Sequence, residues 1–62
     1  MPESEEVARY ARLRHDLANP LAAILAEAQL LLLDAPALDA ETRRAVTVIE
    51  EMALRMRALL KG

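Results

Sequence analysis

The sequence predicts an all-α fold, an antiparallel two-helix hairpin that dimerises into a four-helix bundle. Two apolar stripes at helical spacing flank a short segment of turn-forming residues, and 55% of the 62 residues are hydrophobic while only 2% are aromatic. This composition, rich in Leu, Ala, Arg and Glu, is typical of long helices and coiled coils. No turn dipeptide or alternating pattern indicates a hairpin of strands.

The first helix is predicted over residues 4–33. Ser4 is followed by two glutamates, a pattern in which a hydroxyl caps the helix and acids interact favourably with its N-terminus. The apolar stripe repeats at spacings of three and four residues, as on one face of an amphipathic helix. This rhythm becomes that of a coiled coil from Leu17 onward. The stripe consists of Tyr10, Leu13, Leu17, Leu21, Ile24, Ala28 and Leu31.

A turn is predicted over residues 34–39, because Asp34, Pro36 and Asp39 are turn or cap formers and proline disfavours a continuing helix. Asp39 is well suited to cap a second helix over residues 40–60. So short a connection makes the helices antiparallel neighbours. The second stripe consists of Thr42, Ala45, Ile49, Met52, Met56 and Leu59, and it is widened by Val46, Ala53 and Leu60.

Association with a second copy is the expected extra source of stability for this single domain, residues 1–62. A chain of this length buries only about 60% of its unfolded surface. It has no cysteine and one histidine, so neither disulfides nor a structural zinc site can stabilise the fold. The run from Leu30 to Leu33 points apolar side chains all round the first helix, which indicates contacts on more than one side. A second hairpin would close a four-helix bundle around a twofold axis.

Charge and composition exclude several functional classes. The net charge is −2 with both signs interspersed, and no basic patch or aromatic platform indicates nucleic-acid binding. The longest uncharged run, residues 17–26, is too short to cross a membrane. The acidic N-terminus is unlike a secretory signal. No contact with nucleic acid or membrane is therefore expected.

Three unusual residues lie close together in the first helix. His15 falls roughly 150° from the centre of the apolar stripe, so it is expected to face solvent, with Asn19 and alanines on the same strip. Pro20 interrupts a strong helical pattern at a cost of about 3 kcal/mol relative to alanine, so the helix is expected to bend near His15. Asp16 can accept the proton of one ring nitrogen and leave the other as a nucleophile.

Each of these residues taken alone has an ordinary structural interpretation. A lone exposed histidine is more often silent, Asp16 is most often a solvated charge, and Pro20 is a tolerated kink. Met52 and Met56 are interpreted as gap-filling core residues and not as a cofactor site. The joint occurrence of the three residues at fixed spacing favours a functional interpretation.

The segment His15-Asp16-Leu17-Ala18-Asn19-Pro20-Leu21 resembles the H-box of sensor histidine kinases, written H-[ED]-x-x-[NT]-P-L. Residues 22–25 continue as in members of that family, and the likeness covers essentially the whole chain. Ala18 departs from the pattern, because many members carry a basic residue there. The chain thus resembles the dimerisation and histidine-phosphotransfer (HisKA-type) domain of two-component sensor kinases.

The resemblance implies a role for each residue of the motif. His15 would accept the γ-phosphoryl group of ATP, typically on Nε2, and pass it to an aspartate of a response-regulator receiver domain. Asp16 would orient the ring and act as general base. Asn19 would position the attacking water when the regulator is dephosphorylated, and Pro20 would provide a bend that accompanies signalling. It also implies a homodimer in the cytoplasm, whether or not the parent sensor is membrane-bound.

Phosphoryl transfer from ATP needs a phosphate cradle and Mg²⁺ ligands, and the chain has a single glycine. ATP and Mg²⁺ are therefore expected to be used by a separate ATP-binding catalytic domain, while the hairpin itself binds no cofactor or metal. The hairpin would be a substrate and carrier in the kinase reaction, not a self-sufficient enzyme. Two alternatives stay open: a purely structural or regulatory dimerisation module with a silent histidine, and a stand-alone phosphorelay intermediate.

Overall fold

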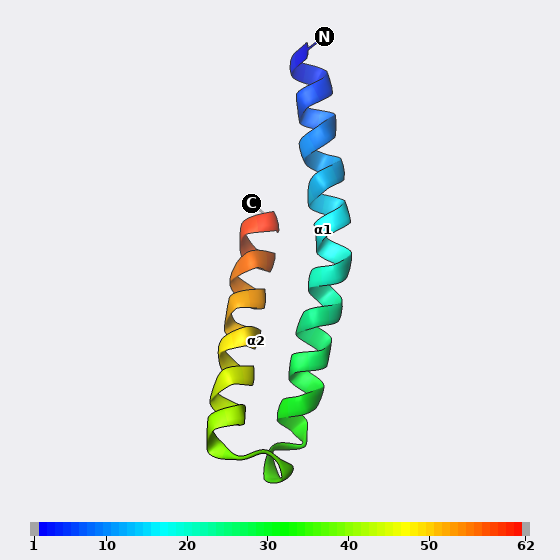
Figure 1. Ribbon diagram of the computed structural model, residues 1–62. Helices are drawn as coiled ribbons and strands as arrows, with labels where there is room; N and C mark the ends of the chain where they lie inside the picture. The colour runs from blue at the N-terminus through cyan, green and yellow to red at the C-terminus, as the bar shows by residue number, and fades with distance from the viewer. Residues whose placement is uncertain (1, 62) are drawn as a thin grey trace.

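The computed structural model describes the backbone of residues 2–61 and the side chains of residues 4–34 and 36–61. It contains α1 (Pro2–Leu33), a short 3-10 turn η1 (Ala35–Ala37) and α2 (Ala40–Lys61). The two helices lie side by side and antiparallel, and the N-terminal part of α1 extends beyond the end of α2 (Figure 1). The molecule is a rod of 55 × 14 × 12 Å. The all-helical hairpin predicted from the sequence is confirmed.

The ends of the helices differ slightly from the expected ones. The first helix begins at Pro2, where the missing N–H of proline costs nothing because it would have no partner in the first turn. Ser4 therefore lies inside the helix and is not its cap. The helix continues without interruption through Pro20, and the bend expected there stays a prediction. The second helix ends at Lys61, one position past residue 60.

The turn between the helices is held by backbone hydrogen bonds. The N–H of Asp34 donates to the carbonyl of Leu31 at 3.1 Å, and the N–H of Ala37 donates to the carbonyl of Asp34 at 3.0 Å. The first of these bonds satisfies the carbonyl of Leu31, one of the groups that the end of α1 leaves without a helical partner. Pro36 lies in the 3-10 turn, where its fixed φ fits and α1 has already ended.

Asp39 caps α2, as the sequence predicted. Its Oδ1 accepts a hydrogen bond of 2.7 Å from the backbone N–H of Thr42, and its carbonyl accepts the first helical bond, 3.0 Å from the N–H of Arg43. Hydrogen bonds from the Thr42 side chain and then from its backbone lower the pKa of Asp39 below its ordinary value of 3.8. The charged carboxylate is therefore the form that the helix end stabilises.

The core is small and lies where the two helices touch. Leu21 and Leu25 of α1 are each 5% exposed and pack with Ala53 of α2, which is 3% exposed. Ala28 and Val46 are also buried. In α2 the buried residues are thus those that the sequence analysis placed at the margin of the stripe. The small Ala53 allows the helices to approach closely at this point.

Most of the remaining stripe is exposed in the single hairpin, whose apolar faces were expected to be covered only in a four-helix bundle. A helix neighbour covers only one sector of an apolar face, and faces this wide need neighbours on two sides. The uncovered residues line adjoining hollows along one side of the hairpin, which we call the apolar groove. Its lining includes Val7, Tyr10, Leu13, Leu17, Pro20, Ile24, Leu31, Ile49, Met52, Met56 and Leu59.

The segment Ser4–Leu33 is long and apolar enough to cross a membrane by length and composition alone. The uncharged run of residues 17–26 is too short to cross a membrane. The longer stretch meets the criterion because a few charged residues, such as Glu27, are allowed in it. A core helix of a bundle passes the same test.

Replacing Leu25 by alanine is expected to destabilise the hairpin strongly, because Leu25 is buried at the helix contact. Core Leu→Ala changes cost about 2–5 kcal/mol in free energy of unfolding. Leu33→Ala is the matched control, since Leu33 is 80% exposed and surface changes usually stay within about 0.5 kcal/mol. Urea unfolding at one fixed protein concentration measures both, and equal losses in the two variants would contradict the assigned core.

Replacing Asp39 by alanine is expected to lower the melting temperature at pH 7, because Thr42 then lacks its capping acceptor. The lowered pKa of Asp39 means that its ionic contribution is complete above the unfolded pKa of about 3.9 and is lost as the pH falls through the folded pKa. The Asp39→Asn variant keeps a capping acceptor that does not titrate. Thermal unfolding is followed by circular dichroism at pH 7 and pH 2.5. The difference in melting temperature between the wild type and Asp39→Ala should be smaller at pH 2.5. An equal difference at both pH values would contradict a stabilising role for the charge of Asp39.

Candidate functional site

His15 is exposed on α1, as the sequence predicted, and lies at the edge of a shallow hollow of about 460 Å³ between α1 and the end of α2. We call this hollow the histidine groove. Its floor is made of small and aliphatic side chains, and its remaining members are basic. It is lined by Ala11, Arg14, His15, Ala18, Leu21, Ala22, Leu25, Arg57, Leu60 and Lys61.

The histidine groove and the apolar groove open on different sides of the hairpin. At about 100° per residue, His15 lies roughly 110° around α1 from the sector of Leu21, Leu25 and Ala28 that faces α2, and not opposite to it. Ile24, which lines the apolar groove, lies about 180° from His15. A partner that covered the apolar groove would therefore leave the imidazole accessible.

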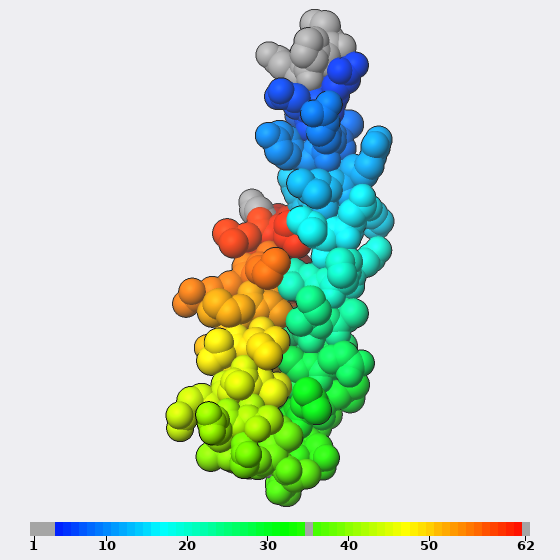
Figure 2. Space-filling view, viewed as in Figure 1, coloured from blue at the N-terminus to red at the C-terminus, as the bar shows by residue number. Residues whose placement is uncertain are grey.

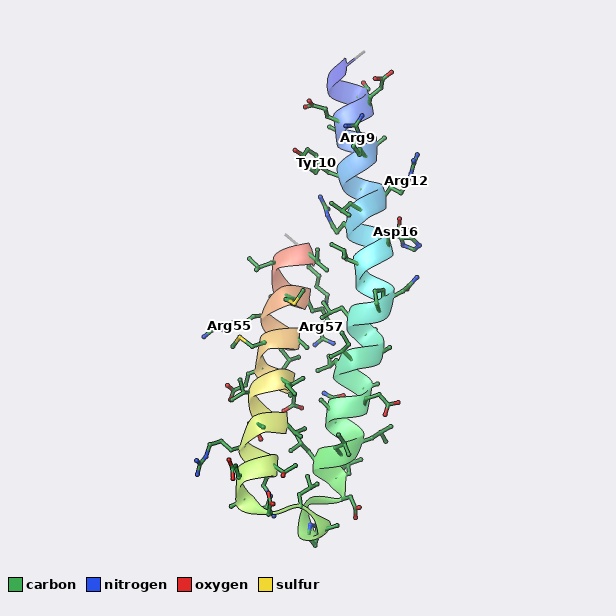
Figure 3. The ribbon with its side chains drawn as sticks, in the orientation of Figure 1. Arg9, Tyr10, Arg12, Asp16, Arg55 and Arg57 are labelled. Carbon is green, nitrogen blue, oxygen red and sulfur yellow. The ribbon has the colours of Figure 1, made fainter. Side chains whose placement is uncertain are left out.

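Asp16 and Asn19 are exposed on α1, and both follow His15 along the helix. Figure 3 shows Asp16 on the side of α1 that points away from α2. Within the described side chains, no hydrogen bond or ion pair joins the carboxylate of Asp16 to the ring of His15. Consecutive helical residues point about 100° apart, so Asp16 flanks the ring, whereas Asn19, one turn further on, shares its strip.

Pro20 lies on a different side of α1 from His15. It is exposed and lines the apolar groove together with Leu17 and Ile24. The structure therefore brings His15 and Asn19 to one strip and places Pro20 on the other accessible face. Any effect of Pro20 on the histidine must pass through the backbone of α1.

Three basic residues line the histidine groove: Arg14 of α1, and Arg57 and Lys61 of α2. No acidic side chain among the described residues lines it. Figure 3 shows the Arg57 side chain between the two helices, while Arg55 points away from α1. Basic residues near the end of α2 can also interact favourably with the helix dipole. Their place beside His15 depends on how the two helices pack against each other. Sequence patterns within one helix do not predict this packing.

The groove offers an accessible imidazole on an apolar floor with positive charge around it. An imidazole nitrogen with a free lone pair is a nucleophile, and nearby cations favour an anionic reaction partner or product. Among the described residues, no group of three or more His, Cys, Asp or Glu side chains could hold a metal ion. Whether the hairpin binds a cofactor stays a prediction.

Comparison with known proteins identifies one family. The model of the His Kinase A (phospho-acceptor) domain matches residues 10–61. The matched range contains most of the chain, including His15, the turn and the whole of α2. Neither the search of curated proteins nor the search of solved structures gave a match.

Proposed function

The chain belongs to the His Kinase A (phospho-acceptor) domain family, and on that premise we propose that His15 carries the phosphoryl group. Domains of this family are the phospho-acceptor and dimerisation domains of histidine kinases in two-component phosphorelay signalling, and they are generally cytoplasmic. One observation carries the proposal: the chain has a single histidine, and it is an exposed side chain inside the matched range.

The transfer is a nucleophilic substitution at phosphorus. The lone pair of His15 Nε2 forms a bond to the γ-phosphorus of ATP, the bond from that phosphorus to the bridging oxygen breaks, and ADP leaves with the electron pair. The proton on Nδ1 then goes to the carboxylate of Asp16. Asp16 is exposed, so its side chain can rotate toward the ring on the ps–ns timescale of surface side chains. The flanking position of Asp16 supports this role.

ATP and Mg²⁺ are supplied by a separate ATP-binding domain of a histidine kinase, since phosphoryl transfer requires a phosphate cradle and metal ligands. A receiver domain of a response regulator takes the phosphoryl group onto an aspartate. Ala18 and Ala22 line the groove beside His15, and their small side chains support close approach of either protein. Asn19, on the strip of His15, would position the water that dephosphorylates the regulator, and Pro20 would let α1 bend.

A second copy of the chain covers the apolar groove. Ile49 is 49% exposed, and Met52, Met56 and Ile24 are likewise open in the single hairpin. Burying such side chains is favourable by about 25 cal/mol for each Å² of apolar surface, and a twofold pair of hairpins closes a four-helix bundle. Because the groove lies on another side of α1 from His15, this dimer keeps the imidazole accessible.

The direct test incubates the chain with ATP, Mg²⁺ and a separately produced histidine-kinase ATP-binding domain. Acid-labile, alkali-stable labelling is expected for the wild type and none for His15→Ala. Asp16→Asn is expected to lower the initial labelling rate about 100-fold or more, the usual size of a general-base contribution. Circular dichroism checks that the variants keep their helices. Labelling that persists in His15→Ala, or a wild type that stays unlabelled while a control domain is labelled, would refute the assignment.

Ile49→Lys is expected to weaken the dimer, because a charge would be buried at the centre of the apolar groove. Leu33→Lys is the matched control, since Leu33 is 80% exposed. Sedimentation equilibrium should give twice the chain mass of 6.9 kDa for the wild type and the control, and a shift toward the single-chain mass for Ile49→Lys. A wild-type chain that stays monomeric at high micromolar concentration would contradict the proposed dimer.

A further inference from the structure

The histidine groove gathers positive charge in a chain that is acidic overall. Of the 8 Lys and Arg residues and 10 Asp and Glu residues in the sequence, the groove is lined by Arg14, Arg57 and Lys61 and by no acid among the described residues. Asp16 is next to His15 in the chain but lies on the other flank, outside the groove. The groove is therefore a local positive site.

The helix dipole does not explain this arrangement. Basic residues near a helix C-terminus interact favourably with the dipole on any side of the helix. Arg55 is also near the end of α2, yet it points away from α1, whereas Arg57 lies between the helices (Figure 3). Arg57 and Lys61 are one turn apart, so they lie on the same side of α2. Together with Arg14 they approach the groove from both helices.

We propose that Arg14, Arg57 and Lys61 are positioning residues that stabilise the doubly charged phosphoryl group once it is bound to His15. This proposal rests on the proposed function, because it assigns the phosphorylated form of His15 a charged environment. Phosphorylation adds nearly two negative charges at pH 7. The groove cations then favour the dianion over the monoanion, because opposite charges nearby lower the pKa of an acid.

The size of the effect follows from Coulomb's law. A cation about 10 Å from the phosphorylated imidazole in water would lower the pKa of its ionisation to the more negative form by about 0.3 unit at low salt. The effect should fade as the ionic strength approaches 1 M, where the Debye length is about 3 Å. A purely structural role, in which the stems of Arg57 and Lys61 only cover the apolar floor, predicts no change in this pKa.

The test phosphorylates the 62-residue chain chemically with phosphoramidate, so no catalytic domain is needed. The lone pair of an imidazole nitrogen forms the bond to phosphorus, the P–N bond of phosphoramidate breaks, and ammonia leaves and takes up the proton released from the ring. The ³¹P chemical shift of the product, followed from pH 5 to 8 at low salt, gives the apparent pKa of the phosphorylated imidazole, to which the phosphoryl group and the free ring nitrogen both contribute. His15→Ala must lack the signal.

Arg57→Gln is expected to raise this pKa by about 0.3 unit and Arg57→Gln with Lys61→Gln by about twice that. Arg57→Lys should stay near the wild-type value because the charge is kept. Arg55→Gln removes the same charge from the outward side of α2 and should change the pKa much less. High salt should erase the differences.

Equal shifts in Arg57→Gln and Arg55→Gln, or no shift in either, would overturn the proposed cationic site. That result is distinguishable from failure of the proposed function. The function fails if ATP and an ATP-binding domain do not label His15, whereas the titration reports on the groove whichever donor supplied the phosphoryl group. Circular dichroism of each variant confirms that the helices are intact before its pKa is compared.

Discussion

The packing of Leu21 and Leu25 against Ala53 fixes how the two helices lie relative to each other. The antiparallel direction of α2 brings its last turns beside the first half of α1. Figure 2 shows the side chains of the two helices meeting along this seam, with the N-terminal part of α1 projecting beyond it. The two grooves of the hairpin follow from this one contact.

The contact divides the surface of α1 into sectors with different tasks. One sector meets α2, the next lines the apolar groove, and the third carries His15. An apolar face that extends past α2 needs a second partner, while the strip of His15 has small neighbours and stays open. A histidine that carries a phosphoryl group must be reached by two different proteins in turn. The separation of the sectors allows association of the chains without covering the reactive ring.

Local patterns predicted much of this structure. The spacing of apolar residues predicted two helices, Asp34 and Pro36 predicted the turn, and Asp39 predicted the cap, because each effect acts within a few residues. The exposure of His15 followed from its angle to the stripe. The start of α1 was misplaced because Ser4 has the chemistry of a cap, whereas Pro2 is equally suited to the first position of a helix.

What the sequence did not predict depends on contacts between the helices. Periodicity gives the width of an apolar face but not which part of it meets which neighbour. Val46 and Ala53 were therefore placed at the margin of the stripe, although they are buried in the hairpin. The place of Arg57 beside the histidine groove likewise follows from the register of α1 and α2.

The hairpin is proposed to carry a phosphoryl group on His15 while a second copy covers its apolar groove. Native mass spectrometry of the chain after reaction with ATP and an ATP-binding domain tests both parts in one spectrum. We expect a dimer bearing added phosphoryl groups, which fragmentation at neutral pH locates on His15. Phosphoryl groups found on another residue, or only on single chains that never pair, would contradict it.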